Sequence, residues 1–541
     1  MRRRPRTGCR LALSLLLGWG ALHADTGSGE RIYRDGLLPG GEALHAERGA
    51  GMPLDGAAAA CVNCHRRSGL GMTEGRTSIP PVAGIYLFHP RAGTADDLDL
   101  PFVEGMRADR DPYTDITLAR AIRAGVGSDG RALNYLMPHY DLDDASMSAL
   151  IDYLRRLSPR KVPGVTEGEL HFATIVTPDA EPAVRAGVLD VLDKFFVDQN
   201  HYRRGNAPRL RSSHRMMFKQ WRTWRLHVWE LTGAPQTWEA QLQARLAAEP
   251  VFAVISGVGG KDWGPVHRFC ESQSLPCLFP NVDLPVVDAT DFDNLYFSKG
   301  VLLESALVAH AIQARAESAA ATRIVQVFRA DDVGREAAGE LARLLGTAGY
   351  VYVDRNVSGR AGGPGPKQAL GTVKAGDVVV LWLRPRDLAA LGPPPPGMEA
   401  VYVSGRMGGL ERAPLPGAWR EVARLAYPFD LPESRRVRVD FPMGWFWIRK
   451  IPVVAQQAQT DTWMACSIVS DALNHMADTF VRDYLVERIE GMLEHRLVTG
   501  YYPRLTLAQN QRFASKGGYL ARFAEPKGTK LVAEGEWMTV P

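Results

Sequence analysis

Residues 251–272 have the sequence Val-Phe-Ala-Val-Ile-Ser-Gly-Val-Gly-Gly-Lys-Asp-Trp-Gly-Pro-Val-His-Arg-Phe-Cys-Glu-Ser. The first six residues form a short apolar run that ends at a glycine-rich stretch, which predicts a buried strand and a turn. The pattern that follows, Trp263–Ser272, predicts a helix. A strand, a turn and a helix in this order form the repeating unit of α/β folds.

The same unit recurs on both sides of this segment. Strand-like runs alternate with helical patterns, and the runs are Leu170–Thr177, Leu226–Leu231, Val251–Ser256, Pro276–Phe279, Leu295–Ser298, Ile324–Phe328, Val351–Asp354, Val378–Leu383 and Ala400–Ser404. This alternation predicts parallel sheets with helices on both faces. About 370 residues exceed one hydrophobic core, so we expect two lobes. A long amphipathic pattern, Thr462–Leu497, predicts one late helix that returns to the first lobe.

The first 24 residues predict export from the cytoplasm. They contain five arginines and no acidic residue, followed by the apolar run Leu11–Leu22 and small residues up to Ala24. This pattern is typical of a secretory signal peptide and indicates a periplasmic protein. The alternative, a membrane anchor, needs about 20 apolar residues. Neither this run nor any later stretch reaches that length, so we expect no stable membrane span.

The overall charge gives no sign of nucleic-acid binding. The formal net charge is +4, but without the five arginines of residues 1–24 the chain keeps 59 basic and 60 acidic side chains. A strongly basic protein is what nucleic-acid binding would require. The export signal points in the same direction, so no nucleic-acid partner is expected.

A second motif, Cys61-Val62-Asn63-Cys64-His65, predicts a cofactor-binding site in the N-terminal part. Two thiols at this spacing meet the two vinyl groups of a haem, and the next imidazole then falls beneath the iron. The motif therefore predicts one covalent haem c attached at Cys61 and Cys64, with His65 as an iron ligand. The alternative, a redox CxxC pair, does not require the histidine.

The sequence Asn134-Tyr135-Leu136-Met137-Pro138 precedes a predicted terminal helix, Ala145–Leu157. With the CxxCH motif, this arrangement resembles class I cytochromes c. The resemblance implies an all-α domain in which His65 and Met137 are the two axial ligands of the haem iron. Such ligation raises the haem potential and fills both axial positions, which suits electron transfer.

Other residues compete for the sixth ligand position. Met72 and Met106 lack the following proline and terminal helix, and His139 lies two residues beyond Met137. Met137 could also be a plain core methionine. We expect Tyr135 and Tyr140 to pack beside the haem.

The C-terminal part resembles the periplasmic branched-chain amino-acid-binding proteins, which are solute-binding partners of ABC transporters. The matching segments are Thr174–Asp179, Ala253–Gly260 and Phe297–Ala309. The resemblance implies a bilobal α/β periplasmic-binding-protein fold that closes on a small solute such as an amino acid or organic acid.

The glycines of the opening segment, Gly257, Gly259 and Gly260, precede a predicted helix, where free N–H groups can bind a carboxylate. The alternative is a tight turn. Asp332 and Ser404 are weaker candidates for the same cleft.

The chain is therefore expected to be multidomain. We assign residues 1–24 to the signal peptide, 25–158 to the cytochrome c domain, 159–168 to a linker with Pro and Gly residues, and 169–541 to the two-lobed binding domain.

Among the remaining cysteines, Cys9 leaves with the signal. Cys270 and Cys277 either form a disulfide or stay reduced. Cys466 is expected to be a buried free thiol on a helix.

These expectations favour a periplasmic c-type cytochrome that transfers electrons through one haem. Its fused solute-binding-like module would sense or recruit a small molecule or a redox partner, for example a dehydrogenase. The alternative is an ABC-type solute-binding protein for an amino acid or small organic acid, with an accessory cytochrome. An oxidase or peroxidase is disfavoured, because a peroxidase needs a vacant haem position or a second haem. We therefore expect an electron carrier and binding protein and not an enzyme.

Overall fold

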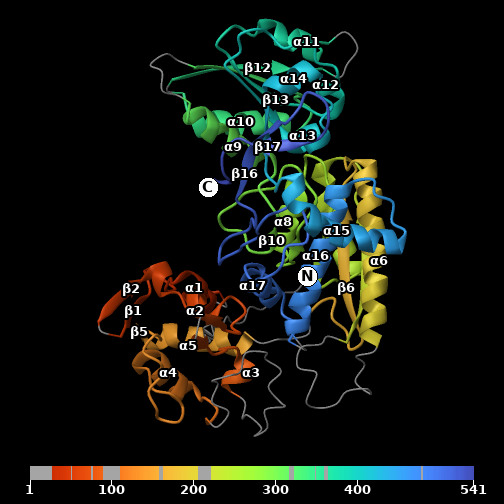
Figure 1. The fold of residues 1–541 in the computed structure, drawn as a ribbon. Helices are drawn as coiled ribbons and strands as arrows, with labels where there is room; N and C mark the ends of the chain where they lie inside the picture. Colours follow the sequence, from red (N-terminus) through yellow and green to blue (C-terminus); the bar gives the residue numbers. More distant parts are fainter. Residues whose placement is uncertain are drawn as a thin grey trace, which may run out of the picture. The chain divides into compact units, whose positions relative to one another are not determined.

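The computed structural model describes residues 27–49, 51–74, 77–88, 110–157, 162–204, 221–315, 322–347, 349–358, 363–476 and 479–540. The chain splits into two compact units (Figure 1). We call the described residues 27–157 the smaller unit and 162–540 the larger unit. The signal segment 1–24, Met106 and the start of the expected linker lie outside the described residues.

The smaller unit combines short helices with two small antiparallel sheets. Its helices are α1 (Ser28–Asp35), α2 (Val62–His65), α3 (Gly84–Leu87), α4 (Asp115–Ala124) and α5 (Asp144–Arg156), with a 3-10 turn at Gly56–Ala59. Strands β1 (His45–Arg48), β2 (Met52–Asp55) and β5 (His139–Asp141) form one sheet in the order β2-β1-β5, and β3 (Met72–Glu74) pairs with β4 (Thr77–Ile79).

The expectation of an all-α domain is therefore wrong, because the smaller unit is mixed. The segments between its helices satisfy their backbone N–H and C=O groups by pairing with one another. Ala46 of β1, for example, lies opposite Leu54 of β2 and opposite Tyr140 of β5.

The longer helices of the smaller unit start and end at capping residues. Thr114 accepts a hydrogen bond from the Thr117 N–H at the start of α4, and Asp143 accepts one from the Ser146 N–H at the start of α5. Gly125, with φ of 64°, ends α4 in the left-handed conformation that suits glycine. Leu118 and Ile122 of α4 then pack in one core with residues of α1 and α5.

The first lobe of the larger unit is a five-stranded parallel sheet in the order β10-β9-β8-β6-β7. Its strands are β6 (Glu169–Val176), β7 (Thr223–Glu230), β8 (Ala253–Ile255), β9 (Cys277–Leu278) and β10 (Asn294–Leu295). The helices of this lobe are α6 (Pro182–Arg204), α7 (Trp238–Ala248), α8 (Gly264–Ser272), α15 (Pro432–Arg449), α16 (Gln456–Met476) and α17 (Arg482–Leu493).

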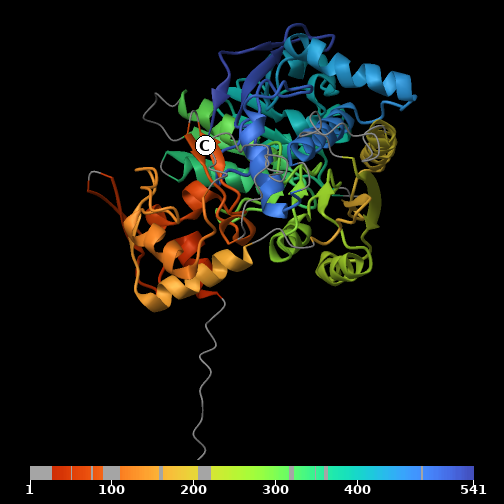
Figure 2. The same ribbon diagram turned by 90° about the horizontal axis from the view of Figure 1, so that it is seen from below.

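Strand β6 shows why both faces of this sheet are apolar. Its successive side chains point to opposite faces. Phe172 meets the ring of Phe196 on α6, whereas Ile175 belongs to a core cluster with Trp238 of α7 and Phe269 of α8. Two perpendicular views show the helices around the sheets (Figures 1 and 2).

The second lobe contains an eight-stranded sheet. Strands β11 (Thr322–Phe328), β12 (Tyr350–Asn356), β13 (Val378–Trp382), β14 (Ala400–Ser404) and β15 (Ala423–Tyr427) are parallel, and β16 (Gly517–Phe523), β17 (Leu531–Ala533) and β18 (Met538–Thr539) add an antiparallel edge. Its helices are α9 (Val301–Gln313), α10 (Gly334–Leu345), α11 (Pro366–Ala369), α12 (Pro385–Ala389), α13 (Gly405–Gly408) and α14 (Gly417–Val422).

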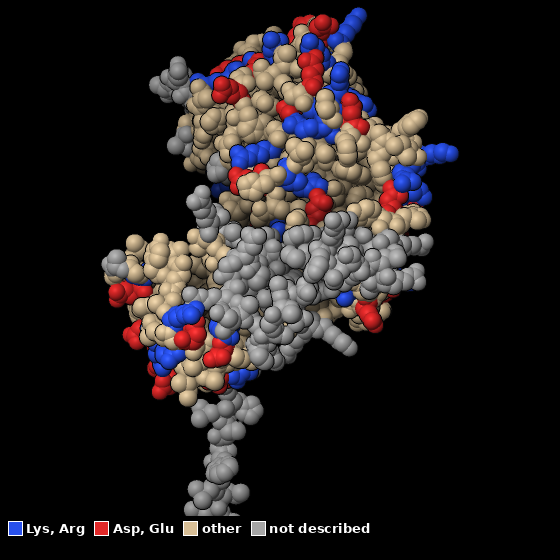
Figure 3. Space-filling model, turned by 60° about the horizontal axis from the view of Figure 1, so that its bottom comes forward, with Lys and Arg blue, Asp and Glu red and all other residues tan. Residues whose placement is uncertain are grey.

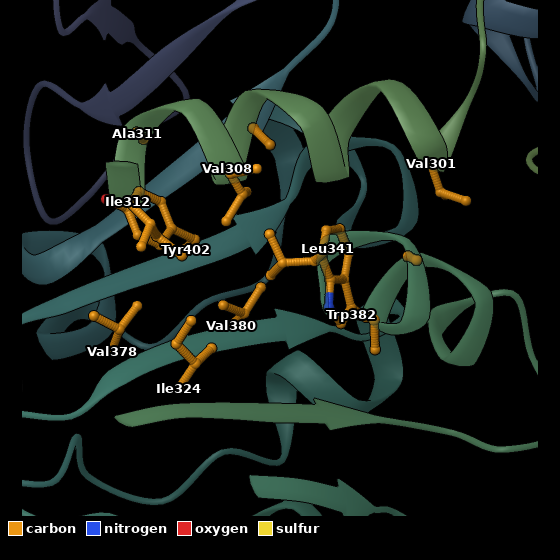
Figure 4. Close-up of a cluster of buried hydrophobic side chains, with 14 of the residues drawn as sticks. Val301, Val308, Ala311, Ile312, Ile324, Leu341, Val378, Val380, Trp382 and Tyr402 are labelled. Carbon is orange, nitrogen blue, oxygen red and sulfur yellow. The ribbon is translucent and has the colours of Figure 1, made fainter. Parts of the chain in front are cut away.

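The core of the second lobe lies between α9, α10 and this sheet. Val308 and Ile312 of α9 face Val380, Trp382 and Tyr402 of the strands, and all of them are buried (Figure 4). The expectation of two lobes with parallel α/β sheets is confirmed by this topology, although β16–β18 were not foreseen.

The late helix expected at Thr462–Leu497 is two helices, α16 and α17. A single helix of that length would extend about 54 Å at 1.5 Å per residue, well beyond a lobe of this size. The chain turns instead near Thr479, and the Arg482 guanidinium donates to the Val251 carbonyl oxygen at 2.7 Å. Within the described parts of the chain, no helix has both the length and the apolar character to span a membrane.

Candidate functional site

A cavity of about 770 Å³ lies in the smaller unit. Residues from both of its sequence motifs line this cavity, together with apolar side chains of α4 and α5: Cys61, Cys64, His65, Met137, Leu118, Ile122, Leu150 and Leu154. The fold thus brings together the four residues that the sequence predicted as haem attachment points and iron ligands.

Helix α2 positions the first three of these residues. Cys61 precedes its first turn, and the His65 N–H donates to the Cys61 carbonyl oxygen at 2.9 Å. His65 is 7% exposed, and its Nδ1 lies 3.0 Å from the carbonyl oxygen of Pro80. Because a carbonyl oxygen accepts, Nδ1 carries the proton and Nε2 keeps its lone pair. Burial lowers the pKa of His65, which favours the neutral imidazole that binds a metal.

A turn in the chain places Met137. The Met137 N–H donates to the Asn134 carbonyl oxygen at 2.9 Å, and the Leu136 N–H donates to the Asn134 side chain at 3.0 Å. Met137 is partly buried and packs against the core of the smaller unit. Asn134 therefore fixes the loop that carries the methionine to the cavity.

Two of the residues that compete with Met137 do not line the cavity. Met72 on β3 and His139 on β5 do not line the cavity, and Met106 lies outside the described residues. Tyr140 lines the cavity and is 6% exposed, as expected for a residue beside a haem. Tyr135 is 74% exposed and does not line it, because the turn that carries Met137 inward directs Tyr135 to solvent.

The cavity fits a haem in size and in chemistry. Its volume lies within the range of about 300–1,000 Å³ that is usual for pockets of small molecules and cofactors. Apolar side chains suit a flat macrocycle, and two free thiols stand at its wall. Arg48 also lines the cavity, and its Nε is buried without a hydrogen-bond partner. Such a cation would suit the carboxylate of a haem propionate.

The predicted glycine loop of the first lobe has a carboxylate partner within the chain. The N–H groups of Gly260 and Lys261 donate to the carboxylate of Asp179 at 3.3 and 3.0 Å. A Cβ on Gly257 or Gly259 would lie 2.6 Å from the indole ring of Trp263. The glycine loop therefore binds a carboxylate of its own chain and makes room for Trp263. Helix α8 begins beyond it, at Gly264.

Charged residues meet between the two lobes, and three of them, Asp283, Arg384 and Arg406, were not predicted from the sequence. Asp283 follows β9 in the first lobe, whereas Arg384 follows β13 and Arg406 follows β14 in the second lobe. Arg384 NH1 lies 2.8 Å from Asp283 Oδ2, and Arg406 NH2 lies 3.3 Å from Asp283 Oδ1. Burial alone would raise the pKa of Asp283, but Arg384 and Arg406 lower it to about 2.

The two weaker candidates belong to this charged cluster. Asp332 accepts two hydrogen bonds of 2.8 Å from Arg384. Ser404 accepts from the Met407 N–H at the start of α13, and its hydroxyl donates to Glu304. Glu304 also accepts from the Arg406 N–H at 2.8 Å, and burial raises the pKa of Glu304 to about 7.

The first lobe adds polar groups that follow strands β8 and β9, and others from helix α16. The hydroxyls of Ser256 and Thr462 lie 2.7 Å apart, and the Asn281 amide donates to both. Asp461 is 3% exposed and accepts from the Tyr502 hydroxyl at 3.2 Å, while burial raises the pKa of Asp461 to about 7. Ligands of α/β proteins commonly bind at the carboxyl ends of strands. Polar residues that directly follow predicted strands were the signal that could have found this cluster.

The remaining cysteines are resolved in the larger unit. Cys270 of α8 and Cys277 of β9 form a disulfide. Cys466 is a buried free thiol on α16, as expected, and burial raises its pKa.

The described surface shows charges of both signs. On the face drawn in Figure 3, basic and acidic side chains are interspersed over the part of the chain that the structure describes. That part of the face carries no patch of a single sign of the kind that nucleic-acid binding uses.

No family model matches the chain, and no curated protein matches it. Among solved structures, the chain is similar to a substrate-binding periplasmic protein from Ralstonia solanacearum, with 13% identity and a TM-score of 0.48, covering 68% of this chain and 100% of that one. It is also similar to a fatty acid ABC transporter substrate-binding protein from Thermomonospora curvata, with 14% identity and a TM-score of 0.47, covering 70% and 95%. A third similar structure is a branched chain amino acid ABC transporter protein from Thermus thermophilus with bound valine, with 11% identity and a TM-score of 0.45, covering 69% and 97%.

Proposed function

We propose that this protein is a periplasmic electron carrier with one covalent haem c in its smaller unit. The observation that carries the proposal is that Cys61, Cys64, His65 and Met137 all line one cavity. A haem bound there would supply a one-electron Fe(III)/Fe(II) couple. Export is supported by the arginine-rich start and apolar run of residues 1–24.

Each residue has a defined task in this proposal. The thiols of Cys61 and Cys64 would attach a haem, and His65 would offer Nε2 to its iron, while the Pro80 carbonyl oxygen holds Nδ1. Met137 would offer its sulfur from the loop that Asn134 fixes. The apolar residues of α4 and α5 exclude water, which favours electron transfer without bond making. In this proposal no residue is catalytic, and the redox partner is another periplasmic protein such as a dehydrogenase.

The proposal is tested by spectroscopy on the purified mature chain. Met137→Ala should convert a low-spin haem to a high-spin one and lower its midpoint potential, because the iron loses a thioether ligand. Met72→Ala is the matched control and should change neither property. A native protein that is high-spin, or a Met137→Ala variant with an unchanged spectrum, would reject the ligand assignment.

A second candidate function, solute binding by the larger unit, is favoured by the cluster between its lobes. Polar and charged residues from the carboxyl ends of strands in both sheets meet there, which is where α/β folds place ligands. The chemical class that we propose is an amino acid or small organic acid. Thermal-shift measurements against such compounds test it directly. Haem potentiometry with and without a bound solute then shows whether the two units are coupled, since coupling must shift the midpoint.

A further inference from the structure

The guanidinium groups of Arg384 and Arg406 are held in place by residues of their own lobe. Arg384 presents one edge to Asp332 through two hydrogen bonds of 2.8 Å, which leaves NH1 to point elsewhere. The backbone N–H of Arg406 donates to Glu304, and the Arg406 guanidinium lies over the ring of Phe429 at 5.6 Å. Both cations are therefore oriented before anything from the first lobe reaches them.

The contact that Arg406 makes across the lobes is incomplete. Its hydrogen bonds to Asp283 and to the Val282 carbonyl oxygen are long, at 3.3 and 3.4 Å. The Arg406 side chain is 10% exposed, and its Nε is buried without a hydrogen-bond partner. A guanidinium normally binds a carboxylate through two parallel N–H groups. Asp283 uses only one N–H of Arg406, so this arginine keeps the capacity to bind a better-placed carboxylate.

A second buried atom without a partner lies close to this arginine. Asp461 Oδ1 is buried and accepts no hydrogen bond, although its other oxygen is bound by Gln457 and Tyr502. Asp461 and Arg406 interact electrostatically. Buried polar atoms are rarely left unsatisfied in a folded protein. A donor and an acceptor without partners on neighbouring side chains indicate a place that receives a polar molecule.

We infer that Arg384 and Arg406 form a carboxylate-binding site between the two lobes, and that Asp283 occupies it in this structure as an internal carboxylate. The inference deepens the proposed solute-binding function and rests on it, because it names the group of the solute that the cleft recognises. A solute carboxylate would take the place of the Asp283 carboxylate on the two guanidinium groups. Asp283 is 28% exposed and lies on a loop, so it can turn to solvent when it is displaced.

The test removes the internal carboxylate and supplies an external one. Asp283→Ala in the full mature chain should unfold at a lower temperature than the wild type in sodium chloride. Sodium acetate at the same ionic strength should raise its Tm saturably, by a few degrees at saturation. The wild type should respond much less, because its own carboxylate competes. Asp283→Ser replaces this variant if the alanine variant does not fold.

The double variant Asp283→Ala/Arg406→Ala identifies the acceptor and should lose the acetate response. If acetate stabilises Asp283→Ala no more than chloride does, or if the double variant keeps the response, the inference is overturned. The proposed solute role is tested separately, by the response of the wild type to amino acids and organic acids. Suppose that acetate stabilises Asp283→Ala but that no amino acid or organic acid stabilises the wild type. This result would support the carboxylate site and reject the proposed solute role.

Discussion

The cavity of the smaller unit and the charged cluster of the larger unit differ in how their reactive groups are satisfied. In the smaller unit, two thiols, an imidazole and a thioether surround an open volume, and Arg48 keeps a buried Nε without a partner. Between the lobes, Asp283 and Asp332 accept hydrogen bonds from Arg384, so most charges have partners from the chain itself.

The two sites therefore place different demands on an external group. An apolar cavity with free ligand atoms gains its packing and its bonds from a cofactor that enters it. A cluster of paired ions is already stable, so a solute must compete with an internal carboxylate. Affinity in the larger unit is therefore expected to depend on the cost of displacing Asp283.

The largest effect is expected from the thiols of the cavity. Replacing both Cys61 and Cys64 by alanine should abolish covalent haem completely, because the macrocycle loses both attachment points. Haem staining of the denatured polypeptide measures this loss. The matched control is Cys270→Ser/Cys277→Ser, which removes the disulfide of the larger unit and should leave haem staining unchanged. Haem that stays attached after the first double substitution would contradict the assignment of the cavity.

The sequence predicts these two sites to very different extents. Three of the residues that we propose hold a haem, Cys61, Cys64 and His65, form one contiguous motif, and Met137 is marked by the proline and helix that follow it. The cluster between the lobes joins Asp283 to Arg384 and Arg406. These arginines lie more than a hundred residues further along the chain and follow strands of another sheet. Strand and helix patterns predict the two lobes but not which strand ends face each other across them.

Local sequence patterns did not predict features that depend on contacts between distant parts of the chain. The glycine loop was predicted as an anion site because it precedes a predicted helix, whose first N–H groups lack partners within the helix. In the structure, Asp179 at the end of another strand supplies a carboxylate to the N–H groups of Gly260 and Lys261. The expectation of an all-α smaller unit came from the resemblance to class I cytochromes c, and the strands of this unit have only three or four residues. Such short strands form through pairing with distant segments and leave no periodic pattern.

An intermediate effect is expected at Glu304, which is fully buried within the charged cluster. Burial raises its pKa from 4.5 to about 7, so the folded protein binds more protons than the unfolded chain between these values. The free energy of unfolding should therefore fall as the pH rises from about 4.5 to 7, by up to about 3 kcal/mol. Glu304→Gln should make this slope shallower without removing it, because burial also raises the pKa of Asp461 to about 7. Urea unfolding at several pH values between 4.5 and 8 measures it.

The control for this measurement is Glu433→Gln, because the Glu433 side chain is 75% exposed. It should keep the slope of the wild type. An equal slope in Glu304→Gln and the wild type would mean that Glu304 is ionised throughout. The cluster would then carry one more negative charge, and the competition that a solute carboxylate meets would be stronger than we expect.

The smallest effect is expected at Asp179. Its substitution shows whether the glycine loop has a structural role or a binding role. Asp179→Ala leaves the N–H groups of Gly260 and Lys261 without their acceptor, and it should lower the free energy of unfolding by about 1–2 kcal/mol. Asp193→Ala, at a side chain that is 64% exposed, is the control and should change stability by less than about 0.5 kcal/mol. If Asp179→Ala left stability unchanged but gained affinity for an added carboxylate, the glycine loop would be an anion site that Asp179 blocks. Both lobes would then hold an internal carboxylate in the place of a solute, and the larger unit would contrast with the open cavity of the smaller unit at two sites.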